Sequence, residues 1–126
     1  MAYLDSLQID ESQKVYCHGD LNSDNIFIGH NLELSIIDFA DAISAPLEYE
    51  QALIACELFG FENPYMLGYF GDYATDEMIE LCMEGLLIHD FGSDILQNRI
   101  GPVKDIHSFD VLRARLHNSI NGQRRT

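Results

Sequence analysis

Two stretches near the N-terminus decide the fold: HGDLNSDN at residues 18–25 and IIDFAD at residues 36–41. In both stretches, acidic or amide side chains lie directly beside an apolar run. One apolar run, at 15–17, leads into the first stretch, and another, at 26–28, follows it. The first stretch is therefore predicted to be a polar loop between two apolar segments.

The second stretch is predicted to lie at the end of a β-hairpin. Gly29-His30-Asn31 has the residue types of a turn, and residues 32–37 then alternate and become continuously apolar, as in a buried strand. We therefore predict that 26–28 and 32–37 pair as a hairpin. Such a pairing brings Asp38 back toward Asn25, about a dozen residues earlier in the chain.

The spacing of these residues resembles that of protein kinases. There a His-x-Asp loop is followed by an Asn five residues after the Asp, and an Asp-Phe-Gly lies on the next hairpin. Asp20 and Asn25 have this spacing, and Asp38-Phe39 follows an apolar strand. Phosphoryl transfer needs a carboxylate beside the attacking hydroxyl, and oxygen ligands that hold Mg²⁺ against the nucleotide phosphates.

The version with Gly19 in place of Arg resembles the aminoglycoside phosphotransferase family, which shares the kinase fold but modifies small molecules. The loop of that family typically has the sequence His-Gly-Asp-Leu with a downstream Asn, and its metal aspartate lies in Ile-Asp-Phe or Ile-Asp-Trp. The segment 46–50, PLEYE, is also similar to the family. The resemblance covers residues 15–58, and the rest is similar only in being helical.

The resemblance implies a role for each motif residue. Asp20 would be the catalytic base, and Asn25 and Asp38 would hold Mg²⁺ and, through it, the nucleotide. His18 would brace the loop, and Asp41 would lie near the site. The implied cofactors are Mg²⁺ and ATP or GTP, and the implied partner is a small, possibly cationic molecule, with antibiotics among the substrates of the family.

Two other interpretations of the chain stay open. It could be a non-catalytic kinase-like remnant that acts as a binding module, or a helical domain in which the motif is a coincidence. Only 14 residues precede the segment 15–45 with the loop and hairpin, so the sequence has the features of a C-terminal lobe without the N-terminal lobe that covers the nucleotide. We therefore expect weak or no ATP turnover by the chain alone, and self-association through exposed apolar surface.

The expected fold class is α+β and mostly helical: the C-terminal lobe of a protein-kinase-like fold, with the hairpin and about three following helices. Helices are expected from Pro46 to Gly60, over 76–90 with Gly92 ending the helix, and over 105–118, and 61–74 is expected to be a loop or short helical turns. The predicted parts are a connector at 1–14, the loop and hairpin at 15–45, a helical subdomain at 46–118, and a frayed tail at 119–126.

A second motif, His89-Asp90-Phe91-Gly92, also contains Asp-Phe-Gly. It ends a helical pattern far beyond Asn25, so no hairpin brings it to the loop, and we assign it no catalytic role. The acidic residues at 72–84 have two interpretations, a solvated helix face or a binding surface for a cation. The aromatic residues Tyr65, Tyr69, Phe70 and Tyr73 likewise indicate either packing or ligand stacking.

Charge and cysteine content narrow the class of partner. The chain has 21 acidic and 7 basic residues, a net charge of −14. Such acidity disfavours nucleic acid and anionic membranes and attracts cations. The three cysteines are widely spaced in apolar contexts, which fits a reduced, cytoplasmic setting.

Overall fold

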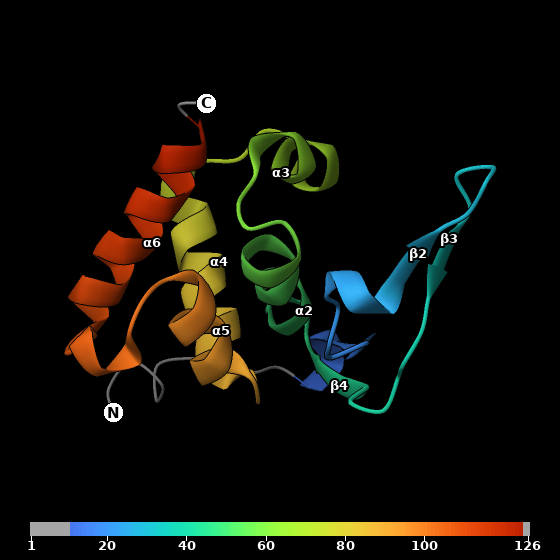
Figure 1. Cartoon of the computed structure of the whole chain (residues 1–126). Helices are drawn as coiled ribbons and strands as arrows, with labels where there is room; N and C mark the ends of the chain where they lie inside the picture. Colours follow the sequence, from blue (N-terminus) through green and yellow to red (C-terminus); the bar gives the residue numbers. More distant parts are fainter. Residues whose placement is uncertain (1–10, 125–126) are drawn as a thin grey trace.

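The segment with the motif begins and ends at one small sheet. In the computed structural model, which describes residues 11–124, β1 (Lys14–Cys17) pairs antiparallel with β4 (Ile43–Pro46), with Cys17 opposite Ile43 (Figure 1). The sequence analysis did not predict β4. Since β1 and β4 are neighbours, residues 18–42 leave the helical part of the molecule and return to it at the same place.

The predicted hairpin is confirmed. Strand β2 (Ile26–Ile28) pairs antiparallel with β3 (Leu34–Ile36), with Ile26 opposite Ile36. The hairpin projects away from the helices (Figure 1), and every residue from 27 to 41 is exposed. The prediction that 32–37 is a buried strand is therefore wrong within this chain, although its apolar character was identified correctly.

The helical part contains more helices than expected. Five α-helices follow β4 in the described residues: α2 (Leu47–Leu53), α3 (Asn63–Phe70), α4 (Thr75–Ile88), α5 (Gly92–Arg99) and α6 (Phe109–Arg124). Helix α2 continues into a π-helical turn, Ile54–Leu58. The expectation of about three helices missed α5, and it allowed only short turns where α3 forms.

Gly92 does not end α4, as predicted, but begins α5. Helix α4 stops at Ile88, and the Gly92 N–H donates to the His89 carbonyl at 3.0 Å in a tight turn. A Cβ on Gly92 would lie 1.8 Å from the Leu86 carbonyl oxygen. Glycine is needed here because the two helices are joined by a close approach of backbone to backbone.

The predicted ends of the chain need two corrections. Helix α6 runs to Arg124, so 119–124 is helix rather than a frayed tail, and 125–126 lie outside the described residues. The predicted connector 1–14 lies outside the described residues for 1–10. Residues Glu11–Gln13 form a 3₁₀ turn, and Lys14 already belongs to β1.

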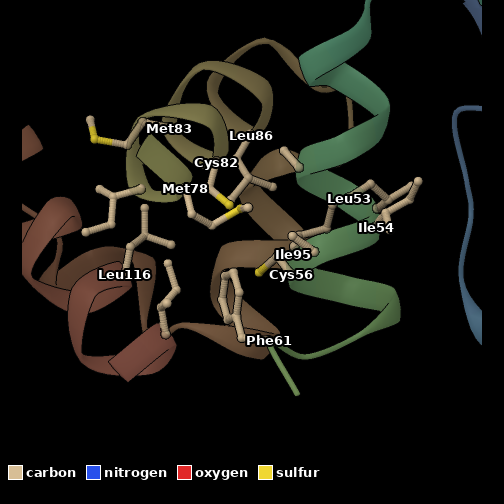
Figure 2. Close-up of a cluster of buried hydrophobic side chains, with 14 of the residues drawn as sticks. Leu53, Ile54, Cys56, Phe61, Met78, Cys82, Met83, Leu86, Ile95 and Leu116 are labelled. Carbon is tan, nitrogen blue, oxygen red and sulfur yellow. The ribbon is translucent and has the colours of Figure 1, made fainter. Parts of the chain in front are cut away.

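The main hydrophobic core lies between the helices. Side chains of α2, α4, α5 and α6 converge there, among them Leu53, Cys82, Ile95 and Leu116 (Figure 2). Helices α2 and α4 pack closely because residue 85 is glycine: a Cβ there would lie 2.1 Å from the Glu48 carbonyl oxygen. This body holds the C-terminal end of β4 and hence the base of the motif segment.

The three cysteines are buried free thiols. Burial raises the pKa of the Cys56 thiol to about 12, and burial also raises the pKa of Cys82. Both side chains therefore stay protonated at neutral pH and pack as small apolar residues.

Within residues 11–124, no helix combines the length and the apolar character needed to cross a membrane.

Candidate active site

The polar loop 18–25 follows β1 directly and ends in a 3₁₀ turn, Ser23–Asn25. Asn22 caps this turn, since its Oδ1 accepts a hydrogen bond from the Asp24 N–H at 2.9 Å. The other end of the Asn22 amide is also used: Nδ2 donates to Asp20 Oδ1 at 3.0 Å. The same side chain therefore shapes the turn and orients the Asp20 carboxylate.

Asp20 and Asn25 are joined directly. Asn25 Nδ2 donates to the Asp20 carbonyl oxygen at 2.9 Å and lies 3.4 Å from Asp20 Oδ2. Asn25 is 7% exposed, whereas Asp20 is only half-buried. Because the side-chain amide nitrogen of Asn25 is held by Asp20, its side-chain oxygen Oδ1 is the atom left to act as a ligand.

Asp38 comes to this pair through the hairpin. The Ile37 N–H donates to the backbone carbonyl oxygen of Asn25 at 3.0 Å, which extends the β2–β3 pairing by one residue. Because Asp38 follows Ile37, its backbone lies close to that of Asn25. Asp38 has φ +63°, a left-handed conformation that is uncommon for a residue other than glycine. Its exposed Oδ1 accepts from the Ala40 N–H at 3.4 Å. Backbone strain of this kind is concentrated at functional sites.

The side chains of Asn25 and Asp38 have the chemistry to hold a magnesium ion that would also bind the phosphates of a nucleotide. Asn25 and Asp38 offer an amide and a carboxylate oxygen, the ligand types that Mg²⁺ prefers. Among the described residues, no group of three or more His, Cys, Asp or Glu side chains is arranged to hold a metal. A site of one or two protein ligands suits Mg²⁺, because this ion usually keeps several waters and binds substrate phosphates.

His18 joins the loop to the hairpin. Its Nδ1 accepts from the Asp20 N–H at 3.1 Å, and its Nε2 lies 2.7 Å from the Ile37 carbonyl oxygen. An accepting Nδ1 assigns the ring proton to Nε2, which then donates to Ile37. The ring also lies against Phe39, with centroids 4.7 Å apart. His18 is thus buried between the two stretches rather than open to a substrate.

Asp41 reaches the loop with its backbone. Gly19 has φ +90°, and a Cβ added there would lie 2.3 Å from the Asp41 carbonyl oxygen. Glycine at position 19 is therefore required by steric contact, a reason that sequence reasoning did not identify. The Asp41 side chain is exposed.

Glu50 is a supporting residue to which the sequence analysis gave no role. Its carboxylate accepts the backbone N–H groups of both His18 and Gly19, the latter at 3.2 Å. A carboxylate that accepts two backbone N–H groups is a strong, charge-assisted brace. The signal in the sequence was the acidic residue in the segment PLEYE, which enters α2.

A small pocket of about 150 Å³ opens beside Asp20. Its walls come from the loop, from α2 and the π-helical turn, and from α5, which the sequence analysis missed. The charged groups on it are Asp20, Glu57 and Asp94, and Arg99 pairs with Glu57 at 3.1 Å. The remaining lining residues are Asn22, Leu53, Phe91, Ile95 and Asn98.

The acidic residues expected at 72–84 line a separate groove of about 430 Å³. Burial, followed by the charges of Glu48 and Glu80, raises the pKa of Glu84. The groove is lined by Glu48, Asp76, Glu77, Glu80, Leu81 and Glu84.

The aromatic residues of 59–73 form ring contacts with one another, for example Tyr69 with Phe70 at 4.7 Å between centroids.

A family model described as the phosphotransferase enzyme family matches residues 1–79, which include the loop, the hairpin and α2. A solved structure, spectinomycin phosphotransferase APH(9)-Ia in complex with ADP and spectinomycin, is similar with a TM-score of 0.51 and 18% identity. The alignment covers 99% of this chain and 42% of that one. A search of curated proteins finds no match.

Proposed function

The chain belongs to the phosphotransferase enzyme family, and from this premise we propose that it serves the transfer of the γ-phosphoryl group of ATP or GTP to a hydroxyl of a small molecule. The alignment spans less than half of the similar solved structure, so the activity proposed is that of the complete phosphotransferase site. The observation that supports it most is the hydrogen-bonded pair of Asp20 and Asn25 beside Asp38.

In this proposal Asp20 is the catalytic base. Its carboxylate is fixed by Asn22 and Asn25 and lines the pocket, so it can accept the proton of a hydroxyl bound there and orient the oxygen for attack. Asn25 and Asp38 would hold Mg²⁺, which when bound neutralises charge on the nucleotide phosphates. Glu50 and His18 keep the loop in the shape that presents Asp20.

The pocket beside Asp20 favours a cationic substrate. Asp20, Glu57 and Asp94 give it three carboxylates, and among the described residues it is Glu57 that pairs with Arg99. An ammonium group of the substrate could pair with Asp94 while a neighbouring hydroxyl meets Asp20. The acidic groove at Glu80 and Glu84 is a second surface that would attract cations, but Asp20 does not line it.

A second candidate function is a binding module without turnover. It is favoured by the exposure of the hairpin, because within residues 11–124 the hydrogen bond of the Asp38 side chain is the 3.4 Å contact with the Ala40 N–H. Such a module would still bind a nucleotide with Mg²⁺, but it would not transfer phosphate. The two candidates therefore agree on binding and differ in the fate of the γ-phosphate.

Calorimetry and a phosphate-transfer assay on the same protein separate these candidates. We expect ATP or GTP to bind only with Mg²⁺, and Asp38→Ala to abolish that binding. Asp24→Ala, in the same loop, is the matched control and should bind normally. Asp20→Asn should keep binding and lose transfer to an amino-substituted sugar. Transfer by the unmodified chain, even if it is slow, would contradict the module, and no binding by a folded chain would contradict both candidates.

A further inference from the structure

The turn His89-Asp90-Phe91-Gly92, between α4 and α5, lies against the catalytic loop. His89 is 6% exposed, and its ring stacks on Tyr49 of α2 with centroids 4.0 Å apart and planes at 19°. Phe91 lines the pocket beside Asp20. Although this turn is about 70 residues away in sequence, it supports the same loop as the hairpin does.

The protonation of the His89 ring follows from its neighbour. The Phe91 N–H donates to His89 Nδ1 at 3.0 Å. A nitrogen that accepts a hydrogen bond has no proton, so the neutral ring has its proton on Nε2. This Nε2 is buried and has no hydrogen-bond partner within residues 11–124. A buried donor without an acceptor is costly and needs an explanation.

The start of the catalytic loop packs near this ring: Ile88 packs against the cluster of Cys17 and Tyr49, and Phe91 shares a pocket with Asp20. Burial lowers the pKa of His89, whereas the charges of Asp90, Glu50 and Asp20, and the Gly19 backbone as a hydrogen-bond acceptor, act to raise it. A backbone accepts through its carbonyl oxygen, so the Gly19 carbonyl is the group on the loop that could receive the His89 Nε2–H, which forms no hydrogen bond within residues 11–124. Gly19 already gives its N–H to Glu50.

His18 has a corresponding arrangement in which both ring nitrogens have hydrogen-bond partners. Its Nδ1 accepts the N–H two residues later, that of Asp20, just as His89 accepts the N–H of Phe91. Its Nε2 then reaches a backbone carbonyl, that of Ile37, at 2.7 Å. The peptide between Gly19 and Asp20 is therefore held at its N–H by His18, which leaves the Gly19 carbonyl as the group that a second histidine could hold.

We propose that His89 is a positioning residue for Asp20: its Nε2–H donates to the Gly19 carbonyl when the catalytic loop tightens, and the two histidines together fix the peptide plane that precedes Asp20. This inference rests on the proposed function only in naming Asp20 as the group that is positioned. Tyr49, stacked on the ring, limits its rotation. Asp90, Glu50 and Asp20 are the charged groups that face it.

Two matched variants separate the two nitrogens of the ring. Asn at position 89 can accept the Phe91 N–H as Nδ1 does, but it is too short to reach Gly19. Gln places an amide N–H where Nε2 is. Amide hydrogen exchange, measured by NMR, should show the Gly19 and Asp20 amides exchanging about tenfold faster in His89→Asn, the factor expected for one lost hydrogen bond. His89→Gln should stay close to the unmodified protein, and α6 should be unchanged in both.

The proposal would be overturned if the loop amides of His89→Asn exchanged as in the unmodified protein, or if both variants loosened the loop and α6 alike. A measurement without any variant gives an independent check. The ¹³C chemical shift of the Gly19 carbonyl should change with pH at the same midpoint as the His89 ring, whose pKa is lowered by burial from the usual 6.5. A Gly19 carbonyl that does not follow the His89 titration contradicts the contact. Neither experiment needs turnover, so failure here is distinct from failure of the proposed phosphotransferase.

Discussion

The hairpin β2–β3 and the helical body, α2 to α6, differ in what their apolar residues do. In the helical body, Leu53, Met83 and Leu116 are almost completely buried (Figure 2). In the hairpin, Phe27 is 54% exposed, and the exposure of Ile28 and Leu34 is larger still. Both regions are rich in apolar residues, but within residues 11–124 those of the helical body are covered by other side chains and those of the hairpin are not.

The helical body and the hairpin therefore contribute to different properties, the first to stability and the second to the candidate site. Burial of apolar surface is the dominant favourable contribution to folding, so the helical body should determine the free energy of unfolding. The candidate ligand Asp38 lies beyond the hairpin, where every residue from 27 to 41 is exposed. His18 lies between the two regions and is braced from both sides, by the Ile37 carbonyl oxygen and by the Glu50 carboxylate of α2.

The largest expected effect comes from truncating one leucine in each region. Leu116→Ala removes a completely buried side chain of α6 and should lower the free energy of unfolding by about 2–5 kcal/mol. Leu34→Ala, at a side chain that is 63% exposed, should change it by less than about 0.5 kcal/mol. Urea unfolding followed by circular dichroism measures both. Equal losses would mean that the hairpin belongs to the core.

A pair of glycines gives the next largest effect, and the two signs should be opposite. Gly85→Ala places a methyl group 2.1 Å from the Glu48 carbonyl oxygen and should cost about 1–3 kcal/mol by forcing α2 and α4 apart. Gly122→Ala meets no atom within 4 Å in α6 and should stabilise by about 0.5–1 kcal/mol through helix propensity. Thermal unfolding checks the signs, and a neutral Gly85→Ala would contradict the close helix packing.

The smallest expected effect is on association. The exposed apolar side chains of the hairpin should pair with a second copy, so the sedimentation coefficient should rise with protein concentration. Replacing Ile28 and Leu34 by Thr keeps strand propensity and should weaken this rise. Leu67→Gln, at an exposed site on α3, is the control and should leave it unchanged. An unmodified chain that remains a monomer at all concentrations would show that the hairpin does not mediate self-association.

The sequence was sufficient for local features with a strong chemical reason. The turn residues 29–31 between two apolar runs predicted the hairpin, which is confirmed. The spacing of Asp20, Asn25 and Asp38 carried the resemblance to a phosphotransferase family, which the match over residues 1–79 confirms. The roles given to Asp20, Asn25, Asp38, His18 and Asp41 remain predictions. The structure adds the contacts through which these residues meet.

Long-range contacts are what the sequence could not supply. Helix α5 was missed because Gly92 is a common helix stop, and only its contact with the Leu86 backbone shows why it begins a helix here. Strand β4 depends on pairing with β1, which no local pattern encodes. The brace from Glu50 to Gly19 joins residues about 30 positions apart, so it could not be predicted from spacing.

The central claim is that the metal–nucleotide site lies at Asn25 and Asp38 rather than on the acidic helical body. Mn²⁺ prefers the same oxygen ligands as Mg²⁺ and broadens the NMR signals of nearby amides. We would titrate Mn²⁺ with ATP into the ¹⁵N-labelled chain. The account predicts that the amides of Asn25 and Asp38 broaden first and that Asp38→Ala removes this effect. Broadening first at Glu80 and Glu84, with Asn25 and Asp38 still sharp, would contradict it.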